Sequence, residues 1–338
     1  MKAAIILKQR QVQMSEIAAP QAGEGDVLIR ITALGLCGSD LATYRGINPM
    51  VSYPRIPGHE VAGEIAEVGP EVPPDFVIGS SVTVLPYTAC GRCSACRIGR
   101  VNCCRYNQTM GVQRDGAATE YVVVPYEKVL RADGFTDEQL ICIEPLSVGS
   151  HAVARGGVRQ PDSVLVFGCG LIGLGAIAAA AFRHAEVTAV DIDDGKLQKA
   201  KALGAVNTIN SRREDLRSRA DQITSGDGFS VVIEAVGLGE TFRSAVELGA
   251  FAGRVVYIGY PKEKVTYEPN LFVSRELDVK GSRNALLEDF EAVIDMLLTG
   301  SIDVALYVTH RYRLEQIEEA LKFWDANVSE VTKIMISV

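Results

Sequence analysis

Residues 164–173 read V-L-V-F-G-C-G-L-I-G, and this stretch decides how the rest of the chain is interpreted. An apolar run leads directly into three glycines that fit the pattern G-x-G-x-x-G, namely Gly168, Gly170 and Gly173. In a strand–turn–helix unit the first glycine permits the tight turn, the second lets the backbone approach a pyrophosphate, and the third allows the helix to pack closely on the strand. The pattern therefore predicts a dinucleotide-binding turn.

The residues after this turn indicate which dinucleotide to expect. Leu171 and Ile172 are the first residues of the predicted helix, and the N–H groups of this first turn would bind the phosphates. Asp191 ends the next predicted strand, where a carboxylate accepts hydrogen bonds from the hydroxyls of the adenosine ribose. The same carboxylate would repel a 2′-phosphate, and the residue after it is Ile192 rather than an arginine. We therefore expect NAD in preference to NADP.

Outward from the turn, the chain has the pattern of a parallel sheet. Short apolar runs without alternation occupy residues 187–190, 231–233 and 255–258, and helical stretches separate them. Ligands of such sheets bind at the carboxyl ends of the strands, so four residues that end strands join the predicted cofactor site: Ala235, Val236, Ile258 and Gly259. Lys196 is a candidate for the adenosine hydroxyls, or else a solvated lysine on a helix face. Arg283 is a candidate for the nicotinamide end or for a substrate carboxylate.

The first 150 residues follow a different pattern. Runs rich in Val, Ile and Thr, separated by clusters of Gly or Pro, occupy residues 26–36, 60–68, 81–87 and 120–125. This pattern predicts a compact antiparallel β domain. After the parallel sheet, the chain ends with two helical patterns and a strand-like segment, at residues 286–298, 314–324 and 332–338.

Composition limits the class of partner. A chain of 338 residues is long enough for about two domains. The 34 Lys and Arg against 42 Asp and Glu give a net charge of −8, which argues against a nucleic acid or an anionic membrane. No apolar run reaches the roughly 18 to 20 residues of a membrane span, and residues 3–7 are too short for the apolar region of a signal peptide. We expect a small-molecule substrate and a cytoplasmic location, where thiols stay reduced.

Five of the eight cysteines lie between residues 90 and 104. The spacing Cys90-x2-Cys93-x2-Cys96-x7-Cys104 allows four sulfur ligands to close a tetrahedron around Zn²⁺ with no open position. The sequence therefore predicts a structural zinc site. Cys103 could replace Cys104 as the fourth ligand, and an iron–sulfur cluster, which also uses four cysteines, is the alternative metal group.

A second set of candidate ligands is dispersed along the chain. Cys37, His59 and Glu144 are its members, and Glu60 follows the histidine directly. One thiolate, one imidazole and one or two carboxylates would leave the open fourth position that a catalytic zinc requires. Taken singly, they could also be a buried thiol, a core histidine and a helix-start carboxylate. Spacing alone does not bring these segments together.

The motifs and their order resemble those of the zinc-dependent medium-chain dehydrogenases. The resemblance rests on G-L-C-G-S-D at residues 35–40, G-H-E-x-x-G at residues 58–63, the four-cysteine lobe, the glycine turn, and V-D at residues 190–191. It implies an α/β fold with a GroES-like β-rich catalytic domain and a Rossmann domain built on a doubly wound parallel sheet. The domains implied are residues 1–147, including a zinc lobe at 88–106, residues 148–284, and a C-terminal segment, residues 285–338, that returns to the first domain. A homodimer or homotetramer is also implied.

The resemblance further implies that Cys37 and His59 bind the catalytic zinc. The alcohol dehydrogenase branch has a cysteine where this chain has Glu144, and this departure resembles the polyol, threonine and sugar-acid branch. In that branch Glu60 can bind the metal beside or instead of Glu144. Residues 53–60 and 280–284 resemble those of bacterial L-galactonate and related sugar-acid dehydrogenases.

The expected reaction is oxidation of a secondary alcohol of a polyol or sugar acid, with zinc lowering the pKa of the hydroxyl and NAD accepting the hydride. Ser39 would pass the proton toward solvent. Asp40 would accept a hydrogen bond from His59 and fix its tautomer, or else be a turn or cap carboxylate. The alternatives are an activity like that of L-threonine 3-dehydrogenase or another zinc alcohol dehydrogenase, a zinc-free reductase of enones or quinones, and a non-enzymatic nucleotide-sensing protein on the same fold.

Overall fold

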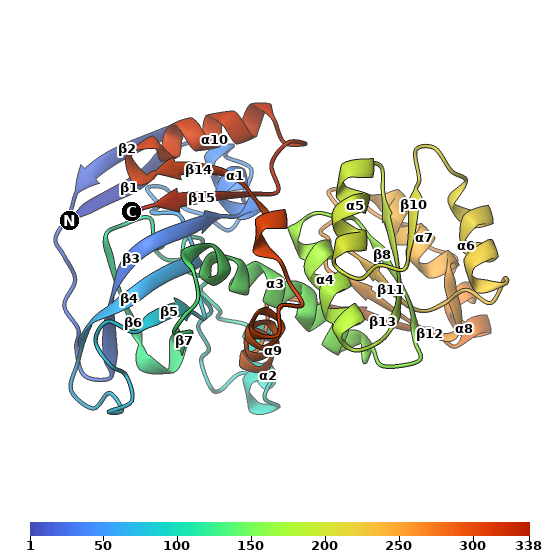
Figure 1. The fold of residues 1–338 in the computed structure, drawn as a ribbon, viewed down its shortest axis with the longest axis horizontal. Coiled ribbons are helices and arrows are strands. Elements are labelled where there is room, and N and C mark those ends of the chain that lie inside the picture. Colours follow the sequence, from blue (N-terminus) through green and yellow to red (C-terminus); the bar gives the residue numbers. More distant parts are fainter. The chain divides into compact units, whose positions relative to one another are not determined.

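The chain passes from one structural unit into a second and then returns to the first. In the computed structural model, which describes all 338 residues, the first unit comprises Met1–Glu144 and Val304–Val338, and the second comprises Pro145–Asp303. Figure 1 shows the order of the elements along the chain by colour. The division expected from the sequence, after residues 147 and 284, stays a prediction, and the fold is described by these two units.

A seven-stranded sheet and a separate hairpin of β1 and β2 form the framework of the first unit. The elements of this unit are β1 (Lys2–Lys8), β2 (Gln11–Glu16), β3 (Asp26–Leu36), α1 (Gly38–Tyr44), β4 (Glu60–Val68), β5 (Ser81–Val84), α2 (Ser94–Arg97), η1 (Val101–Cys103), β6 (Tyr121–Pro125), η2 (Tyr126–Lys128), β7 (Val129–Arg131), η3 (Val304–Leu306), β14 (Val308–Arg313), η4 (Leu314–Gln316), α10 (Ile317–Ala326) and β15 (Lys333–Ser337). The strand order is β14-β15-β3-β4-β5-β7, and β6 pairs with β3. Only β14 and β15 are parallel, so the predicted antiparallel arrangement is confirmed for every other pair.

The sequence of β3 explains its central place in this sheet. Buried and less buried residues alternate up to Thr32, and every residue from Ala33 to Leu36 is buried. The alternating part suits a sheet with one exposed face, whereas the buried part lies between β4 and β15. The strands predicted at residues 26–36 and 60–68 coincide with β3 and β4.

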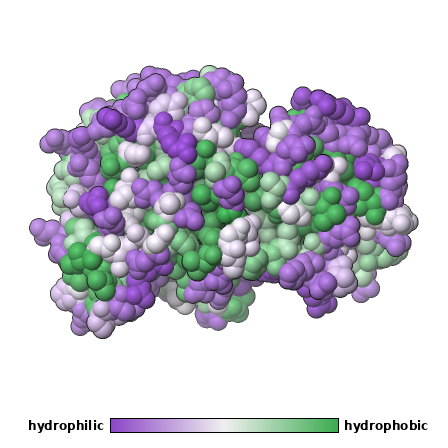
Figure 2. All heavy atoms as spheres, viewed as in Figure 1, coloured by the Kyte–Doolittle hydropathy of each residue, from purple (hydrophilic) through white to green (hydrophobic).

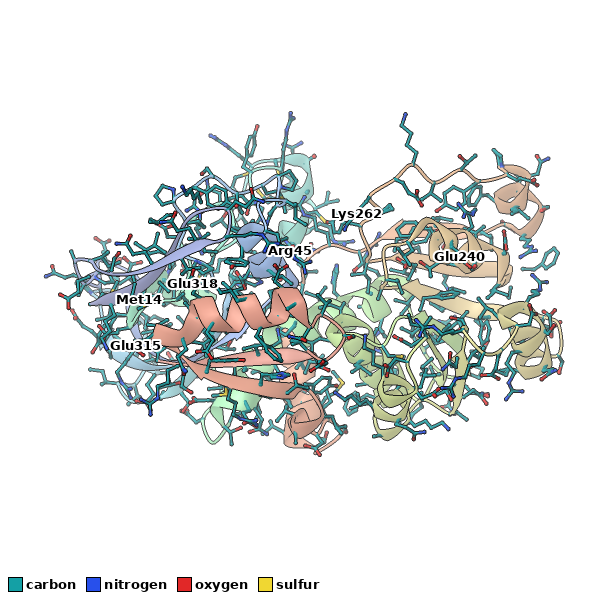
Figure 3. The ribbon with its side chains drawn as sticks, turned by 90° about the horizontal axis from the view of Figure 1, so that it is seen from above. Met14, Arg45, Glu240, Lys262, Glu315 and Glu318 are labelled. Carbon is teal, nitrogen blue, oxygen red and sulfur yellow. The ribbon has the colours of Figure 1, made fainter.

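The core of the first unit takes side chains from both ends of the chain. Ile6 of β1, Leu321 of α10 and Ile336 of β15 have no exposed surface and belong to one apolar cluster. Complete burial of such a side chain stabilises the fold by about 1.5–3 kcal/mol. Arg45, after α1, donates a hydrogen bond to Asp325 of α10, with 2.5 Å between Nε and Oδ1, and Figure 3 shows Arg45 beside this helix. The C-terminal segment is therefore part of this core.

The second unit contains a six-stranded sheet in which all neighbours are parallel. Its elements are β8 (Ser163–Phe167), α4 (Leu171–Phe182), β9 (Glu186–Asp191), α5 (Asp194–Ala202), β10 (Asn207–Asn210), α6 (Leu216–Thr224), β11 (Phe229–Glu234), α7 (Gly239–Glu247), β12 (Gly249–Tyr257), α8 (Asn270–Arg275), β13 (Asp278–Gly281) and α9 (Leu287–Leu298). The strand order is β10-β9-β8-β11-β12-β13. This is the doubly wound Rossmann order, in which the direction of winding reverses between the first and fourth strands, here β8 and β11. The predicted parallel sheet is confirmed.

Some local predictions were wrong. The strand expected at residues 81–87 ends at Val84, and the strand expected at residues 255–258 runs from Gly249 to Tyr257. The proline after Glu144 favours a helix start, because proline lacks the N–H that a helix interior needs. In the structure this proline lies inside α3 (Asp137–Gly156), which begins seven residues before Glu144 and carries two acidic residues in its first turn.

The surface mixes polar and apolar side chains. On the face drawn in Figure 2, hydrophilic residues are interspersed with hydrophobic ones. In the second unit Phe251, Tyr260 and Val273 are 75%, 78% and 82% exposed. None of the helices is long and apolar enough to cross a membrane.

Candidate zinc and dinucleotide sites

The glycine turn has the geometry that its sequence predicts. It connects β8 to α4, and Gly168 has a φ of +90°, which residues with a side chain rarely adopt. A Cβ added to Gly173 would lie 1.8 Å from the carbonyl oxygen of Gly168, so only glycine permits this approach of helix to strand. A Cβ added to Gly170 would meet nothing within 4 Å, which leaves the open space that a bound pyrophosphate needs.

Asp191 is fixed beside this turn by backbone hydrogen bonds. Its Oδ2 accepts from Cys169 N at 2.8 Å, and its Oδ1 accepts from the N–H groups of the two following residues at 2.7 and 3.1 Å. The carboxylate thus stands at the end of β9 with its position set before any ligand binds. Lys196 lies on the following helix α5 and interacts electrostatically with the buried thiol of Cys169.

The other predicted cofactor residues stand at the carboxyl ends of neighbouring strands. Ala235 and Val236 follow β11, and both lie close to Gly168, since a Cβ added there would meet Val236 Cγ2 at 2.8 Å and Ala235 O at 3.3 Å. Ile258 and Gly259 follow β12, and Arg283 is exposed just after β13. Leu171 and Ile172 form the half-exposed first turn of α4. The structure therefore brings the end of β11 to the turn, and the roles of these residues toward NAD stay predictions.

Glu234, which no sequence motif singles out, organises the loop after β11. This carboxylate is fully buried, and its Oε1 accepts hydrogen bonds from Val236 N at 2.9 Å, Gly237 N at 2.8 Å and Thr241 Oγ1 at 2.7 Å. The available signal was a single charged residue at the end of the apolar run V-V-I-E.

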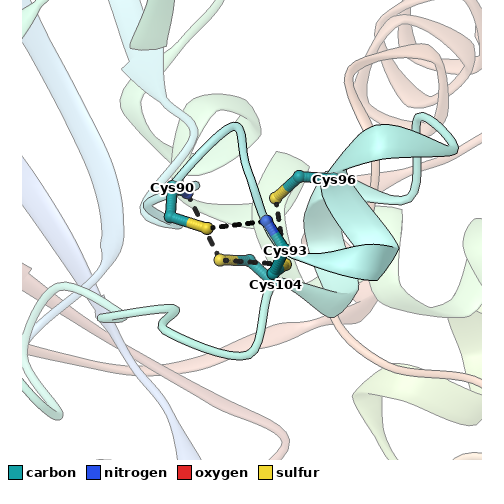
Figure 4. Close-up of side chains that lie close together, drawn as sticks. All are labelled: Cys90, Cys93, Cys96 and Cys104. Atoms are coloured by element: carbon teal, nitrogen blue, oxygen red, sulfur yellow. Dashed lines mark hydrogen bonds between the residues drawn. The ribbon is translucent and has the colours of Figure 1, made fainter.

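Four cysteines converge on one loop of the first unit, as Figure 4 shows. The sulfur atoms of Cys90, Cys93, Cys96 and Cys104 lie within 4.8 Å of one another, and the separation of the Cys93 and Cys96 sulfurs is 3.5 Å. Cys103 is not part of this group. Backbone N–H groups donate to the sulfurs, for example Cys90 N to Cys104 Sγ at 3.3 Å. Such donors stabilise thiolates, so the loop fits a structural Zn²⁺.

Hydrogen bonding shifts the pKa values of two of these thiols in opposite directions. Hydrogen bonds from the backbone of Arg105 and Cys96 lower the pKa of Cys93 to about 6. Desolvation and hydrogen bonding to Cys93 raise the pKa of Cys96 to about 11. The loop therefore holds one thiolate ready for a metal while a neighbouring thiol keeps its proton.

Strand pairing brings the dispersed set together. Cys37 follows the last residue of β3, and Glu60 is the first residue of β4. These strands are antiparallel neighbours in which Gly35 pairs with Glu60. The ligand atoms of Cys37, His59 and Glu60 consequently lie within 4.8 Å of one another.

The site fits a divalent cation that accepts nitrogen, sulfur and oxygen ligands. His59 Nδ1 and Glu60 Oε1 are buried and have no hydrogen-bond partner, although buried polar atoms are normally paired. The pKa of His59 lies well above its usual value: burial alone would lower it, but the negative charges of Cys37, Asp40 and Glu144 outweigh that effect. A pocket of this charge and donor type suits Zn²⁺.

Glu144 lies near this group but not within it. The hydroxyl of Tyr87 donates a hydrogen bond to Glu144 Oε1. Burial raises the pKa of Glu144, which the nearby charge of His59 lowers and that of Glu60 raises further. The structure thus places Glu60 among the ligand atoms, and ligation by Glu144 stays a prediction.

The expected contact between Asp40 and His59 is wrong. Asp40 Oδ2 accepts from Cys37 N at 2.8 Å and Oδ1 accepts from Gly58 N at 3.1 Å, while His59 Nδ1 has no partner. The alternative of a cap carboxylate is correct, because Asp40 caps the start of α1. By binding the backbone beside both ligands it still orients them. Ser39 Oγ is buried and has no hydrogen-bond partner.

Lys333 is a second residue of the sites that was not predicted. It lies at the start of β15 and is only 2% exposed. Its Nζ donates to Leu36 O at 2.9 Å and to Glu60 Oε2. Burial would lower the pKa of Lys333, but the charges of Glu60 and Cys37 outweigh it and raise that pKa. No local motif marks this lysine in the sequence.

Comparisons with known proteins agree with this geometry. Residues 23–134 match the family described as "Alcohol dehydrogenase GroES-like domain", and residues 172–299 match "Zinc-binding dehydrogenase". An uncharacterized zinc-type alcohol dehydrogenase-like protein of Haemophilus influenzae is 37% identical over 94% of this chain and 92% of that protein. The L-galactonate-5-dehydrogenase of Escherichia coli is 33% identical over 98% of this chain and 96% of that protein.

A solved structure adds the cofactor. The crystal structure of a short chain alcohol dehydrogenase from Escherichia coli, complexed with NADH, has a TM-score of 0.92 and 30% sequence identity, and the match covers 100% of this chain and 99% of that one. The predicted fold class, the two zinc sites and the NAD cofactor are confirmed, and neither a zinc-free reductase nor an iron–sulfur protein agrees with them. The chain belongs to the zinc-containing medium-chain alcohol dehydrogenases, as a zinc-dependent, NAD-linked alcohol or polyol dehydrogenase.

Proposed function

We propose that this enzyme oxidises a secondary alcohol of a sugar acid or polyol of the L-galactonate kind to the corresponding ketone, with NAD as the acceptor. The observation that carries this proposal is the carboxylate-rich ligand set, with Glu60 beside Cys37 and His59 and with Glu144 where the alcohol dehydrogenase branch has a cysteine. The L-galactonate-5-dehydrogenase with which the chain aligns over nearly its full length supports the same substrate class.

Three side chains would hold the catalytic zinc, namely Cys37, His59 and Glu60. When bound, zinc supplies a Lewis acid that lowers the pKa of a hydroxyl, and NAD supplies the hydride acceptor. Asp40 keeps Cys37 in place through the backbone N–H of that cysteine. Burial of His59 and Glu60 keeps water from two of the three ligands.

Ser39 is the residue proposed to move the proton. Its Oγ has no partner among the protein atoms, so it is free to accept a hydrogen bond from a substrate hydroxyl. It stands two residues after Cys37 on α1. A hydroxyl there can accept the substrate proton while releasing its own toward solvent, since one hydroxyl both donates and accepts.

In the second unit, we propose that the glycine turn and the N-terminus of α4 bind the pyrophosphate and that Asp191 binds the adenosine ribose. The fixed carboxylate at the end of β9 supports this assignment. Lys196, Ala235, Val236, Ile258, Gly259 and Arg283 complete the proposed surroundings of the cofactor.

We also propose that the enzyme is a homodimer or homotetramer. The strand β13 ends the six-stranded sheet and has no neighbour on its outer side. Phe251, Tyr260 and Val273 expose large apolar side chains on the same unit. Open sheet edges and exposed apolar groups are commonly covered by association. Light scattering of the purified protein tests this assignment.

A substrate screen tests the proposed function. The purified zinc-loaded enzyme is incubated with NAD and a panel of hexonates, hexitols and L-threonine, and NADH formation is followed with and without a chelator. We expect the highest kcat/KM with a hexonate and loss of that activity on chelation. A preference for L-threonine would replace the proposed substrate class, and one observation favours that candidate, a 30% identical L-threonine 3-dehydrogenase of Marinomonas.

A further inference from the structure

The buried lysine of the zinc site has no role in the mechanism described so far. Lys333 is 2% exposed and Glu60 is fully buried. Lysine is almost never buried unless it is paired, and a buried ion pair contributes little net stability, because removing both charges from water costs several kcal/mol per ion. The pair therefore calls for an explanation other than stability.

The position of Lys333 connects it to both ligand-bearing strands. Its strand β15 pairs with β3, with Ile334 opposite Leu36, and β3 in turn pairs with β4. Nζ donates to the carbonyl of Leu36, the residue before Cys37, and to Glu60 Oε2. The ammonium group thus contacts one proposed ligand, Glu60, directly, and it contacts the backbone next to a second one, Cys37.

The carboxylate of Glu60 is confined so that its two oxygens differ. A Cβ added to Gly35 would lie 2.1 Å from Glu60 Oε2, so the absence of a side chain at position 35 makes the space for this oxygen. Oε2 binds Lys333, whereas Oε1 is buried and has no hydrogen-bond partner. Only one oxygen of Glu60 is left for a metal.

The charges of the site explain why a cation is needed there. A thiolate at Cys37 and carboxylates at Asp40, Glu60 and Glu144 carry four negative charges in and around this site, and a bound Zn²⁺ compensates two of them. His59 is neutral when it binds a metal. Lys333 compensates a third charge through Glu60, so the buried group carries more uncompensated negative charge without the lysine than with it.

We propose that Lys333 is a positioning residue that restrains Glu60 to one-oxygen contact with the catalytic zinc and so keeps the remaining coordination position open for substrate. The proposal concerns the metal site and does not depend on which alcohol is oxidised. Without the lysine, Oε2 is released and an uncompensated negative charge remains, and both changes hold the zinc more tightly.

The test compares Lys333→Met with Lys333→Arg, which keeps the charge, and with Lys322→Met as a control on an exposed lysine of the same unit. Each zinc-loaded protein is mixed with excess chelator, and release of the two zinc ions is followed in time. We expect the catalytic zinc to leave Lys333→Met about tenfold more slowly, or slower still. The coupling free energy between two close charges is typically large enough to change an equilibrium by at least about that factor. Release from the four-cysteine loop stays unchanged, and Lys333→Arg and Lys322→Met behave as the parent does.

Cobalt substitution supplies a readout that is independent of activity. The visible absorption bands of Co²⁺ in the catalytic site should change in Lys333→Met, because a second oxygen of Glu60 joins the metal, and should match those of the parent in Lys333→Arg. Lys333→Met combined with Glu60→Gln removes both charges and serves only to show whether the fold survives loss of the pair. Faster zinc release from Lys333→Met, or unaltered release and cobalt bands, would overturn the proposal. So would failure of both Lys333→Met and the double variant to fold, because the pair would then serve the fold alone.

Discussion

At the scale of single residues, each zinc site depends on a few atoms with identifiable neighbours. Cys37, His59 and Glu60 converge because two strands pair, while the four-cysteine loop closes on itself. The sites share no ligand, so a change in one should leave the metal of the other in place. This independence makes zinc content a direct measure of each site.

Replacing Cys37 by serine should remove the catalytic zinc alone. The hydroxyl does not ionise near neutral pH and is a poor zinc ligand compared with a thiolate. We expect metal analysis to fall from two zinc ions per chain to one, and NAD reduction to fall by more than about 100-fold. Cys103→Ser is the matched control, because Cys103 belongs to neither group, and it should keep both ions. Two ions in Cys37→Ser would contradict the assignment.

Asp191 should set the preference between the two dinucleotides. Asp191→Asn keeps one oxygen to accept from the backbone and replaces the other by an amide group, and it removes the charge that repels a 2′-phosphate. We expect the ratio of kcat/KM for NADP to that for NAD to rise by about tenfold or more, since a lost charged hydrogen bond to the ribose costs about 1.5–3 kcal/mol. Asp194→Asn, which changes an exposed carboxylate on α5, should leave the ratio unaltered. An unchanged ratio in Asp191→Asn would count against the proposed ribose contact.

The thiols of the zinc-free protein should differ in reactivity with pH. The pKa of Cys93 is lowered to about 6 by hydrogen bonds, so its thiolate is present at neutral pH and is lost as the pH falls through about 6. Burial raises the pKa of Cys142 to about 12, which keeps it a thiol. Alkylation with iodoacetamide, followed by mass spectrometry, should label Cys93 with a midpoint near pH 6 and leave Cys142 unlabelled at pH 7. A midpoint for Cys93 near 9 would be the contrary result.

How far single residues could be predicted depends on how local their signal is. Cys93 and Gly168 belong to patterns that fit within a few residues, and both lie where those patterns place them. Lys333 lies 273 residues after its partner Glu60, and no spacing connects them. The role of Asp40 was misassigned because its backbone contacts depend on the path of α1, which a sequence does not display.

At the scale of elements, the turn between β8 and α4 is a tightly constrained connection in the second unit. It brings Gly173 against the carbonyl of Gly168 and holds both beside the end of β11. The strands β3 and β4 were predicted with correct ends, because runs rich in Val and Ile between turn residues mark them in the sequence. The helix α3 was not, because the signal of Pro145 competes with the acidic first turn at Asp137.

Two alanine substitutions in this turn should separate packing from cofactor binding. In Gly173→Ala the new Cβ would lie 1.8 Å from Gly168 O, and we expect the free energy of unfolding to fall by at least about 1–3 kcal/mol, as in overpacked sites. In Gly170→Ala the Cβ meets open space, so urea unfolding should change little while the affinity for NADH, measured by fluorescence titration, falls. If both variants lost the same free energy of unfolding, the claim that a Cβ at Gly170 meets open space would be wrong.

At the scale of the whole molecule, the first unit is completed by residues that come last in the chain. Leu321 and Ile336 belong to the same apolar cluster as residues of β1 and β3. The composition and the motifs predicted two folds in one chain. They did not predict β2 or β7, because short strands of mixed polarity lack a distinctive periodicity. They did not predict β1 either, because its apolar run at residues 3–7 was considered only as the apolar region of a signal peptide.

The single tryptophan offers a test of how the C-terminal helix supports this unit. Trp324 lies on α10 and is 8% exposed, so its fluorescence reports on the first unit. Leu321→Ala removes a fully buried side chain, so we expect the free energy of unfolding to fall by about 2–5 kcal/mol. The urea midpoint of the tryptophan signal should fall accordingly. Leu298→Ala, at a 67% exposed position in the second unit, should not shift it. An unshifted midpoint in Leu321→Ala would show that α10 does not support the core.

The insertion of β15 between β14 and β3 has a consequence for biosynthesis. Domains generally fold as units during translation, with N-terminal ones first, at about 5–20 residues per second. Here the second unit, Pro145–Asp303, is fully synthesised before the first can close, because β14, α10 and β15 follow it in the chain. A nascent chain therefore carries Cys37, His59 and Glu60 without their lysine until Lys333 has emerged, so Glu60 gains its partner only after the whole second unit has been made.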